Sequence, residues 1–211
     1  MSQDEVRSLL LKRAAAADLA VDDRLVDRLE TYYQLLARWN ARINLTGFSL
    51  KNPTDQAIDR LIVEPLLIAR ALKYPVGVWF DLGSGGGSPA IPIQLYRPAD
   101  ILVLVESKER KVAFLREVTR SMRLEQVEVE CARIESVATD HRLAGTADLV
   151  TIRAVRPSEA IVASTQRLLR TGGRAALIGS KSDRAFDSQR FEVITATEVT
   201  SRTSLTLLSR T

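Results

Sequence analysis

The chain has 211 residues, 45% of them hydrophobic, which is enough for the core of one domain of ordinary size. Its longest apolar runs fall far short of the roughly 20 residues that a membrane-spanning helix needs. Charged residues also interrupt the apolar residues near the N-terminus, so a secretory signal does not fit. A single cysteine and a single histidine exclude an internal disulfide and give no ligand cluster for zinc. We expect a cytoplasmic, monomeric protein without a membrane segment or a metal.

The net charge of +4 is unevenly distributed along the chain. Residues 151–211 carry ten Lys or Arg and five Asp or Glu, whereas the first 150 residues carry 20 and 21. A basic region of this kind suits a polyanion such as nucleic acid, although scattered arginines are also typical of an ordinary solvated surface. Charge alone therefore does not decide between these two interpretations.

The first 75 residues show the hydrophobic periodicity of helices. Apolar residues at steps of three and four predict one helix over about residues 6–17 and another over 22–43, with Asp22 or Asp23 as its N-cap. A third helix is expected over about 54–72, where Pro65 should kink or split it. Residues 1–75 are therefore expected to form a helical extension that packs on the core.

After Pro75 the pattern changes to short β-rich runs that alternate with helical segments. Such alternation is typical of βαβ units on a parallel sheet. Two β-rich runs near the C-terminus are separated only by Ser201 to Thr203 and predict a closing antiparallel hairpin. The expected strands are Val78–Leu82, Ile101–Glu106, Val127–Cys131, Leu149–Arg153, Arg174–Gly179, Phe191–Thr200 and Ser204–Ser209. Residues 76–211 should thus form one α/β domain.

The segment Asp81-Leu-Gly-Ser-Gly-Gly-Gly-Ser-Pro89 follows the first expected strand, and a helix should begin at about Ser88. Glycines permit positive φ and let a ligand lie against bare backbone, and free N–H groups at a helix start favour an anionic or carboxylate group. A tight turn without a ligand is the plainer interpretation, but three alternating glycines exceed what turning requires. The segment therefore predicts a nucleotide-type pocket.

Two acids near this turn indicate the kind of ligand. The dinucleotide fingerprint G-x-G-x-x-G would need glycine at position 88, where the chain has Ser88, and it asks for no acid at position 81. Asp81 suits the ammonium group of an amino-acid ligand, and Glu106, at the end of the second expected strand, suits two ribose hydroxyls. Each acid alone has an ordinary explanation, as a turn acid or an exposed strand end. The pair predicts S-adenosylmethionine as the cofactor and a methyltransferase as the class.

Six segments together resemble one known family. They are Trp39-Asn-Ala-Arg-Ile-Asn-Leu-Thr46, Asp81-Leu-Gly-Ser-Gly-Gly-Gly-Ser-Pro-Ala-Ile-Pro92, Leu104-Val-Glu-Ser107, Arg110-Lys-Val-Ala-Phe-Leu115, Ala132-Arg-Ile-Glu135 and Ile152-Arg-Ala154. They resemble the bacterial glucose-inhibited division protein B family. The resemblance implies a class I, Rossmann-like methyltransferase fold, with a seven-stranded mostly parallel sheet and an N-terminal helical extension. It also implies methyl transfer to N7 of a guanine in the 530-loop region of 16S rRNA, either free or in the small ribosomal subunit.

The resemblance also implies roles for individual residues. The methionine end of the cofactor should meet the turn residues Gly83, Gly85, Gly87 and Ser88, beside Asp81. Its ribose should meet Glu106, and its adenine should meet Ile134 and Glu135. Arg153 matches a family arginine beside the cofactor and the target base, where it would act in positioning. The candidate RNA contacts are further basic residues that follow strand ends: Arg133, Arg156, Lys181 and Arg184.

The chain departs from the family pattern at three places. Family members commonly have a histidine and an Asp-Ser pair in the third helix. The matching segment here, Gln56-Ala-Ile-Asp-Arg60, keeps only Asp59. Ala90 replaces a glycine, and a Lys-Gly pair is displaced in Ile178-Gly-Ser-Lys181. These departures leave open a paralogue that methylates another RNA or a small molecule, and a cofactor-binding module without activity. A dinucleotide-dependent oxidoreductase is disfavoured by Ser88 and Asp81.

Other methyltransferase chemistries lack their residues in this sequence. The Asn/Asp-Pro-Pro-aromatic motif of exocyclic-amine enzymes does not occur. Cys131 ends an expected strand, where we expect a small core residue and not a nucleophile. N7 of guanine has a free lone pair and no proton, so methylating it requires positioning and no general base. The absences therefore suit N7 chemistry.

Overall fold

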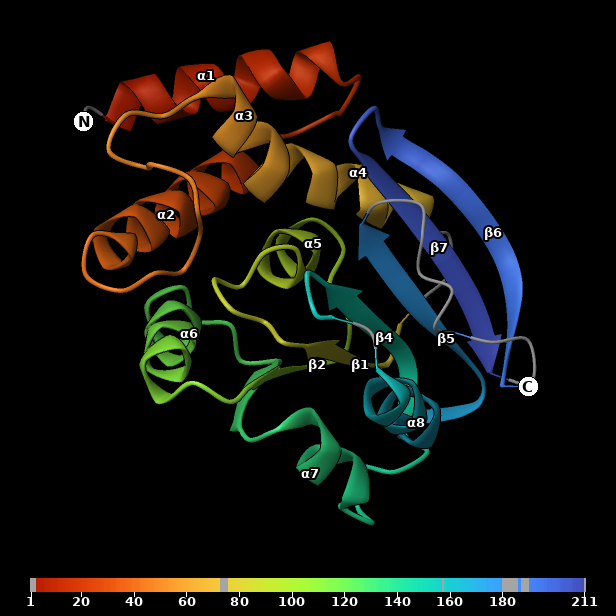
Figure 1. Cartoon of the computed structure of the whole chain (residues 1–211). Coiled ribbons are helices and arrows are strands. Elements are labelled where there is room, and N and C mark those ends of the chain that lie inside the picture. Colours follow the sequence, from red (N-terminus) through yellow and green to blue (C-terminus); the bar gives the residue numbers. More distant parts are fainter. Residues whose placement is uncertain (1–2, 73–75, 157, 180–185, 187–189, 211) are drawn as a thin grey trace. The chain divides into compact units, whose positions relative to one another are not determined.

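The computed structural model of the chain describes residues 3–72, 76–156, 158–179, 186 and 190–210 (Figure 1). The chain divides into two compact units. The helical unit comprises Met1–Lys73, Gly85–Pro98 and Arg110–Glu125, and the sheet unit comprises Tyr74–Ser84, Ala99–Glu109 and Gln126–Thr211. Both units are thus assembled from separate segments of the chain. The domain boundary expected between residues 75 and 76 stays a prediction.

The helical unit confirms the helices expected in the first 75 residues. Its elements are α1 (Gln3–Ala16), α2 (Asp23–Asn40), α3 (Asp55–Ile58), the π-helical segment η1 (Asp59–Val63), α4 (Glu64–Ala71), α5 (Ala90–Tyr96) and α6 (Glu109–Ser121), the last with Glu109 in the sheet unit. The side chains of Asp22 and Thr54 cap α2 and α3 by accepting the N–H groups of Leu25 and Ala57. Val6, Leu10 and Ala14 of α1 recur every four residues and are fully buried. Among the described residues, no helix has the length and apolar content to cross a membrane.

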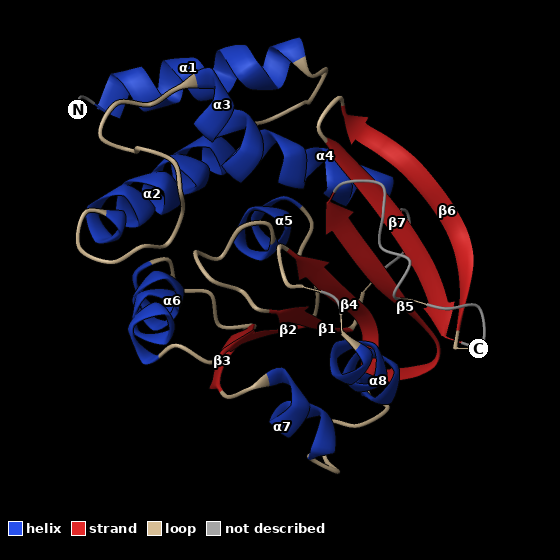
Figure 2. Ribbon diagram, in the orientation of Figure 1, coloured by secondary structure: helices blue, strands red, loops and turns tan. Residues whose placement is uncertain are grey.

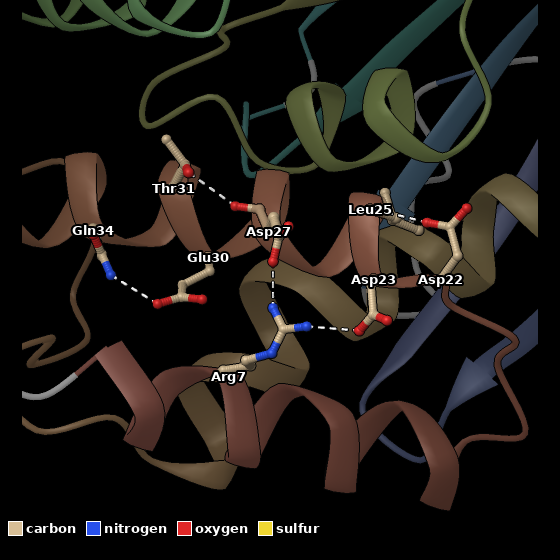
Figure 3. A network of polar contacts seen from close by, with 8 residues as sticks. All are labelled: Arg7, Asp22, Asp23, Leu25, Asp27, Glu30, Thr31 and Gln34. Carbon is tan, nitrogen blue, oxygen red and sulfur yellow. Dashed lines mark hydrogen bonds and ion pairs between the residues drawn. The ribbon is translucent and has the colours of Figure 1, made fainter.

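Arg7 links α1 to α2 on the surface of the helical unit (Figure 3). Its guanidinium donates to Asp23 at 2.7 Å and also pairs with Asp27. The side chains of these two aspartates are 90% and 66% exposed, and exposed ion pairs contribute only about 0–1 kcal/mol. The packing of α1 on α2 therefore depends mainly on the buried apolar residues.

The break expected near Pro65 takes the form of the π-helical segment η1. Pro65 lies in the first turn of α4, directly after η1. The missing N–H of Pro65 leaves the carbonyl of Leu61, four residues earlier, without its α-helical donor. The helix expected over 54–72 is therefore split into three parts.

The sheet unit holds seven strands in the order β3-β2-β1-β4-β5-β7-β6 (Figure 2). They are β1 (Val78–Leu82), β2 (Ile101–Glu106), β3 (Val127–Cys131), β4 (Ala147–Arg153), β5 (Leu169–Gly179), β6 (Phe191–Thr200) and β7 (Thr203–Arg210). The first five strands run parallel, β7 is antiparallel to β5, and β6 is antiparallel to β7. The predicted sheet and its closing hairpin are confirmed.

β5 begins five residues earlier than expected. The pairing with β4 starts at Ala147 and Leu169, and it resumes after an irregularity at Leu149 and Arg174. Gly172 has a φ of +73°, a conformation that favours glycine. The Thr171-Gly-Gly173 segment therefore interrupts the ladder locally and does not end the strand.

One apolar cluster of the sheet unit lies between the strands and two helices, α7 (Ile134–Thr139) and α8 (Glu159–Leu168). Alternate residues of β1, β2 and β4 contribute to it, as expected for strands that present every second side chain to one face. These residues are Phe80, Leu82, Val103, Val105, Val150 and Ile152. Asp81 and Thr151 lie between them in sequence, so they belong to the opposite face of the sheet.

Candidate functional site

Two carboxylates are buried at the carboxyl ends of the neighbouring parallel strands β1 and β2. Asp81 is 2% exposed and Glu106 is 7% exposed. The Glu106 Oε1 atom accepts the N–H of Lys108 at 2.9 Å. The exposed strand end considered for Glu106 is therefore wrong. Burying an ionisable group is costly, so two such acids at the carboxyl ends of neighbouring strands make this a candidate ligand site.

The Asp81 carboxylate is held by a residue of β4. Thr151 donates its hydroxyl to Asp81 Oδ1 at 2.5 Å, and Trp79 Nε1 donates to the Thr151 hydroxyl oxygen at 2.9 Å. Burial raises the pKa of Asp81, and the nearby Glu106 raises it further. The hydrogen bonds from Thr151 and Ser84 and the charge of Arg153 lower it. The geometry therefore fixes a carboxylate whose charge is poorly solvated and suited to a cationic ligand group.

Gly83 makes the turn directly after β1. Its φ is +77°, and a Cβ built on it would lie 2.5 Å from Val155 Cγ2. The N–H groups of Gly83 and Ser84 both donate to the carbonyl of Val105, at 2.9 and 3.1 Å. A side chain here would be strained at this φ and would have to displace Val155. The two hydrogen bonds hold the turn close to the end of β2.

The chain turns again at the end of β4, where the predicted positioning residue lies. Arg153 is the last residue of β4 and is half-buried, and its charge lowers the pKa of Asp81. Ala154 follows with a φ of +57°, which is unfavourable for a residue with a Cβ. The structure thus places Arg153 within electrostatic range of Asp81, as expected if both belong to one site.

The later part of the glycine-rich turn belongs to the helical unit. Gly85 and Gly87 have φ values of +55° and +80°, in agreement with the expected conformational need for glycine. The hydroxyl of Tyr32 in α2 donates to the carbonyl of Gly86 at 2.7 Å. A Cβ on Gly86 would lie 3.2 Å from both Leu36 Cδ1 and the Leu45 carbonyl. Two parts of the N-terminal region therefore support this turn.

Ser88 anchors the end of the same turn. Its hydroxyl donates to the Leu61 carbonyl at 2.8 Å, the carbonyl that Pro65 leaves without its helical donor. The serine that separates this turn from the dinucleotide fingerprint thus supplies the hydrogen bond that Pro65 removes. A contact between Ser88 and the cofactor stays a prediction.

The W-N-x-x-x-N-L-T segment owes its shape to Asn40, the last residue of α2. The Asn40 Oδ1 atom accepts the N–H groups of Leu45 and Thr46 at 2.9 and 3.0 Å. Its Nδ2 atom donates to the Phe48 carbonyl at 3.1 Å. The side chain therefore closes residues 41–48 into a loop and presents the Leu45 carbonyl to Gly86.

The residues expected at the adenine lie at the start of α7. Ile134 is half-buried against the core of the sheet unit, whereas the side chain of Glu135 is exposed and lines an open groove of about 490 Å³ together with residues of α8. Arg167, Arg190 and Arg210 also line this groove. Adenine contacts by Ile134 and Glu135 stay predictions.

The candidate RNA contacts are only partly described. Arg133 precedes α7 and Arg156 follows β4, and both are exposed. Lys181 and Arg184 lie outside the described residues. Within the described part of the chain, no group of three or more His, Cys, Asp or Glu is arranged to hold a metal ion.

The expectation that Cys131 is a small core residue is wrong. Cys131 ends β3 and is exposed. β3 is an edge strand, and only its first residue, Val127, is buried. An edge strand has a neighbouring strand on one side only, so its carboxyl end is less covered. The β-rich pattern therefore did not imply that Cys131 is buried.

Sequence reasoning missed Thr151 and the hydrogen bond that the Tyr32 hydroxyl makes. Thr151 is fully buried, and a hydroxyl residue within the apolar run of β4 was a signal that a polar partner lies nearby. Tyr32 is fully buried, in agreement with the apolar spacing of the helix expected over 22–43. Its hydroxyl nevertheless reaches Gly86, 54 residues away.

Comparison with known proteins gives matches over most of the chain. Residues 25–207 match the family model described as rRNA small subunit methyltransferase G. The chain is 39% identical over 166 residues to ribosomal RNA small subunit methyltransferase G of Paracoccus denitrificans, covering 79% of this chain and 82% of that protein. It is 33% identical over 178 residues to the protein of the same name in Halorhodospira halophila, covering 84% and 79%.

Solved structures share the fold at low sequence identity. A SAM dependent methyltransferase from Aquifex aeolicus superimposes with a TM-score of 0.59 at 12% identity, over 74% of this chain and 94% of that one. TrmN from Thermus thermophilus gives a TM-score of 0.53 at 16% identity, over 71% and 48%. These similarities confirm the predicted fold class.

Proposed function

Because the chain belongs to the rRNA small subunit methyltransferase G family, we propose that it transfers a methyl group from S-adenosylmethionine to N7 of a guanine in 16S rRNA. The observation that carries the proposal is the pair of buried carboxylates, Asp81 and Glu106, at neighbouring strand ends. A ligand with an ammonium group at one end and ribose hydroxyls further along satisfies both acids. Gly83, which has no room for a Cβ, leaves bare backbone beside Asp81 for such a ligand.

In this assignment Asp81 receives the ammonium group, and Glu106 accepts the ribose hydroxyls. Gly83, Gly85, Gly87 and Ser88 line the methionine end, and Ile134 and Glu135 approach the adenine. The bound cofactor supplies a methyl group on a positively charged sulfur. The protein supplies the shape of the pocket and the two carboxylates of Asp81 and Glu106.

The proposed reaction is a direct displacement. The lone pair of guanine N7 forms the new N–C bond while the S–C bond breaks, and its electron pair stays on sulfur as a thioether. N7 carries no proton, so no residue has to act as a base. The protein therefore contributes mainly by bringing N7 and the methyl carbon into line.

Arg153 suits a positioning role in this reaction. Positive charge moves from sulfur to the guanine ring during transfer, so a nearby cation does not stabilise that change. A guanidinium instead donates readily to guanine O6 or to phosphate. Its place at the end of β4, within electrostatic range of Asp81, supports this assignment.

The proposed partner is 16S rRNA, either free or in the small ribosomal subunit, which places the protein's action in the cytoplasm. The excess of basic residues in 151–211 supports a polyanionic partner. Arg133, Arg156, Lys181 and Arg184 are the proposed phosphate contacts, and the enzyme is proposed to act as a monomer.

Methyl transfer tests the proposal directly. The purified protein is incubated with methyl-labelled S-adenosylmethionine and small subunits, or their naked RNA, from cells that lack this modification. The labelled base is then mapped. We expect label at N7 of one guanine, loss of transfer in Asp81→Asn, and full transfer in Asp140→Asn, a control at a half-buried loop aspartate that pairs with Arg142.

Two outcomes would contradict the proposal. Label on another RNA or another atom would indicate a paralogue with a different target. Cofactor binding without transfer to either form of the RNA would indicate a binding module that has lost activity.

A further inference from the structure

A directed chain of hydrogen bonds ends on the acid at the proposed cofactor site. Trp79, Thr151 and Asp81 are 1%, 0% and 2% exposed. We propose that Thr151 is a positioning residue for the amino-acid end of the cofactor, because it holds the Asp81 carboxylate in the orientation that receives the ligand's ammonium group. The inference rests on the proposed function, in which Asp81 binds that ammonium.

The direction of the chain follows from the donors available. The indole Nε1–H of Trp79 can only donate, so it occupies a lone pair of the Thr151 hydroxyl oxygen at 2.9 Å. The single proton of that hydroxyl is then directed at Asp81 Oδ1, 2.5 Å away. A hydroxyl that also accepts a hydrogen bond becomes a stronger donor. The Thr151 hydroxyl therefore accepts from Trp79 and donates its proton to the Asp81 carboxylate.

Strand geometry places the three side chains together. Asp81 and Thr151 are direct partners in the β1–β4 pairing. Trp79 lies two residues before Asp81, on the same face of β1. Threonine is branched at Cβ and has few rotamers in a strand. With Oδ1 held in this way, the plane of the carboxylate and the position of Oδ2 are set before a ligand arrives.

The hydrogen bond also keeps the acid in its binding form. Asp81 is faced by Glu106 from β2, by Arg153 and Thr151 from β4, and by Ser84 from the turn. Burial and Glu106 raise its pKa, whereas Thr151, Ser84 and Arg153 lower it. Removing the Thr151 hydroxyl should raise this pKa further. A larger fraction of the protein then carries a neutral acid that cannot bind an ammonium group.

Binding measurements on variants test the inference. Thr151→Val removes the hydroxyl at nearly constant volume, Thr151→Ser keeps it, and Thr165→Val is the matched control. Thr165 is also fully buried, but its hydroxyl donates to the Ile161 carbonyl within α8. The dissociation constant of S-adenosylhomocysteine is measured by calorimetry over a pH series. Methylthioadenosine, which lacks the amino-acid end, is measured in parallel.

We expect Thr151→Val to weaken binding of S-adenosylhomocysteine by about tenfold at neutral pH, the loss of roughly one charge-assisted hydrogen bond. The pH midpoint of binding should move upward. Thr151→Ser should restore both values, and Thr165→Val should change neither. Methylthioadenosine should bind wild type and Thr151→Val equally well, because it has no ammonium group.

Unchanged affinity and an unchanged pH midpoint in Thr151→Val would overturn the inference, as would an equal loss for both ligands. If Thr151→Val fails to fold, Thr151→Ala gives the same comparison. Failure of the premise gives a different result: wild type then binds neither ligand, or Asp81→Asn binds S-adenosylhomocysteine as well as wild type does.

Discussion

Ala154 carries backbone strain directly after a residue of the proposed site. Its φ of +57° lies in the left-handed region, which costs a residue with a Cβ about 1–2 kcal/mol. Its side chain is exposed, so apolar packing does not offset that cost. Strain of this kind persists where the surrounding structure requires one conformation. At this position the strained residue lies where β4 ends, directly after Arg153.

Replacing Ala154 by glycine should raise the stability of the protein and lower its activity. Glycine removes the strain, and after its greater flexibility in the unfolded state is counted, the free energy of unfolding should rise by up to about 1 kcal/mol. Methyl transfer should fall, because a freer turn holds Arg153 less firmly. Urea unfolding and the labelled transfer assay measure the two effects.

Arg123→Gly is the matched control for this variant. Arg123 has a φ of +50° just after α6, and its side chain is exposed. It should gain similar stability without a change in transfer. A loss of stability in Ala154→Gly would show that the backbone at 154 is not strained.

At the scale of elements, α2 carries two neighbouring tyrosines of different character, one of which supports the glycine-rich turn. Tyr32 and Tyr33 are both fully buried. The Tyr32 hydroxyl donates to the Gly86 carbonyl. Among the described residues, the Tyr33 hydroxyl has no hydrogen-bond partner, and burial raises the pKa of Tyr33 to about 12. α2 therefore holds one buried hydroxyl that bonds to the glycine-rich turn and, one residue later, a buried hydroxyl that bonds to nothing described.

Phenylalanine should affect stability differently at the two positions. Tyr32→Phe leaves the Gly86 carbonyl without its donor and should lower the free energy of unfolding by about 1–2 kcal/mol. It should also weaken cofactor binding, because the glycine turn is held less firmly. Tyr33→Phe removes a buried hydroxyl that bonds to nothing described, so stability should stay constant or rise.

Urea unfolding and calorimetry with S-adenosylhomocysteine measure the effects of both tyrosine variants. Equal losses of stability in the two variants would show that the bond to Gly86 contributes nothing beyond packing. Wild-type cofactor affinity in Tyr32→Phe would show that the turn does not depend on α2.

For the whole molecule, the features that were predictable from the sequence are local ones. Helix and strand periodicity reveals the elements, because each face repeats within a few residues. The three alternating glycines at 83, 85 and 87 indicated positive φ, which the structure confirms at each of them. Asp81 and Glu106 could be selected because each lies at the carboxyl end of a strand that is recognisable in the sequence.

The features that were not predictable depend on pairing between distant segments. The hydrogen bond between Thr151 and Asp81 joins residues 70 positions apart, and it exists only because β4 lies beside β1. The start of β5 was missed because Gly172 and Gly173 resemble a turn. The exposure of Cys131 follows from the edge position of β3, which no local pattern shows.

Asp81 connects the site to the stability of the whole chain. In the unliganded protein, burial raises its pKa, so the folded chain binds this proton more tightly than the unfolded chain does. Above the raised pKa, the folded state must bury a charged carboxylate, which lowers the free energy of unfolding. As the pH falls from that value toward the ordinary pKa of an unfolded aspartate, the cost progressively disappears. Asp81 therefore destabilises the unliganded protein most at pH values above its raised pKa.

Asp81→Asn should consequently make the unliganded protein more stable and the enzyme inactive. Asn still accepts the Thr151 hydrogen bond through Oδ1, but it carries no charge. The variant's free energy of unfolding should exceed that of wild type at neutral pH, and the difference should shrink as the pH falls. S-adenosylmethionine at 100 times its dissociation constant should stabilise wild type by about 2.7 kcal/mol and the variant by much less. Urea unfolding with and without cofactor measures both effects. A variant less stable than wild type at neutral pH would show that the Asp81 charge is compensated before the ligand binds, so that this acid is a structural one.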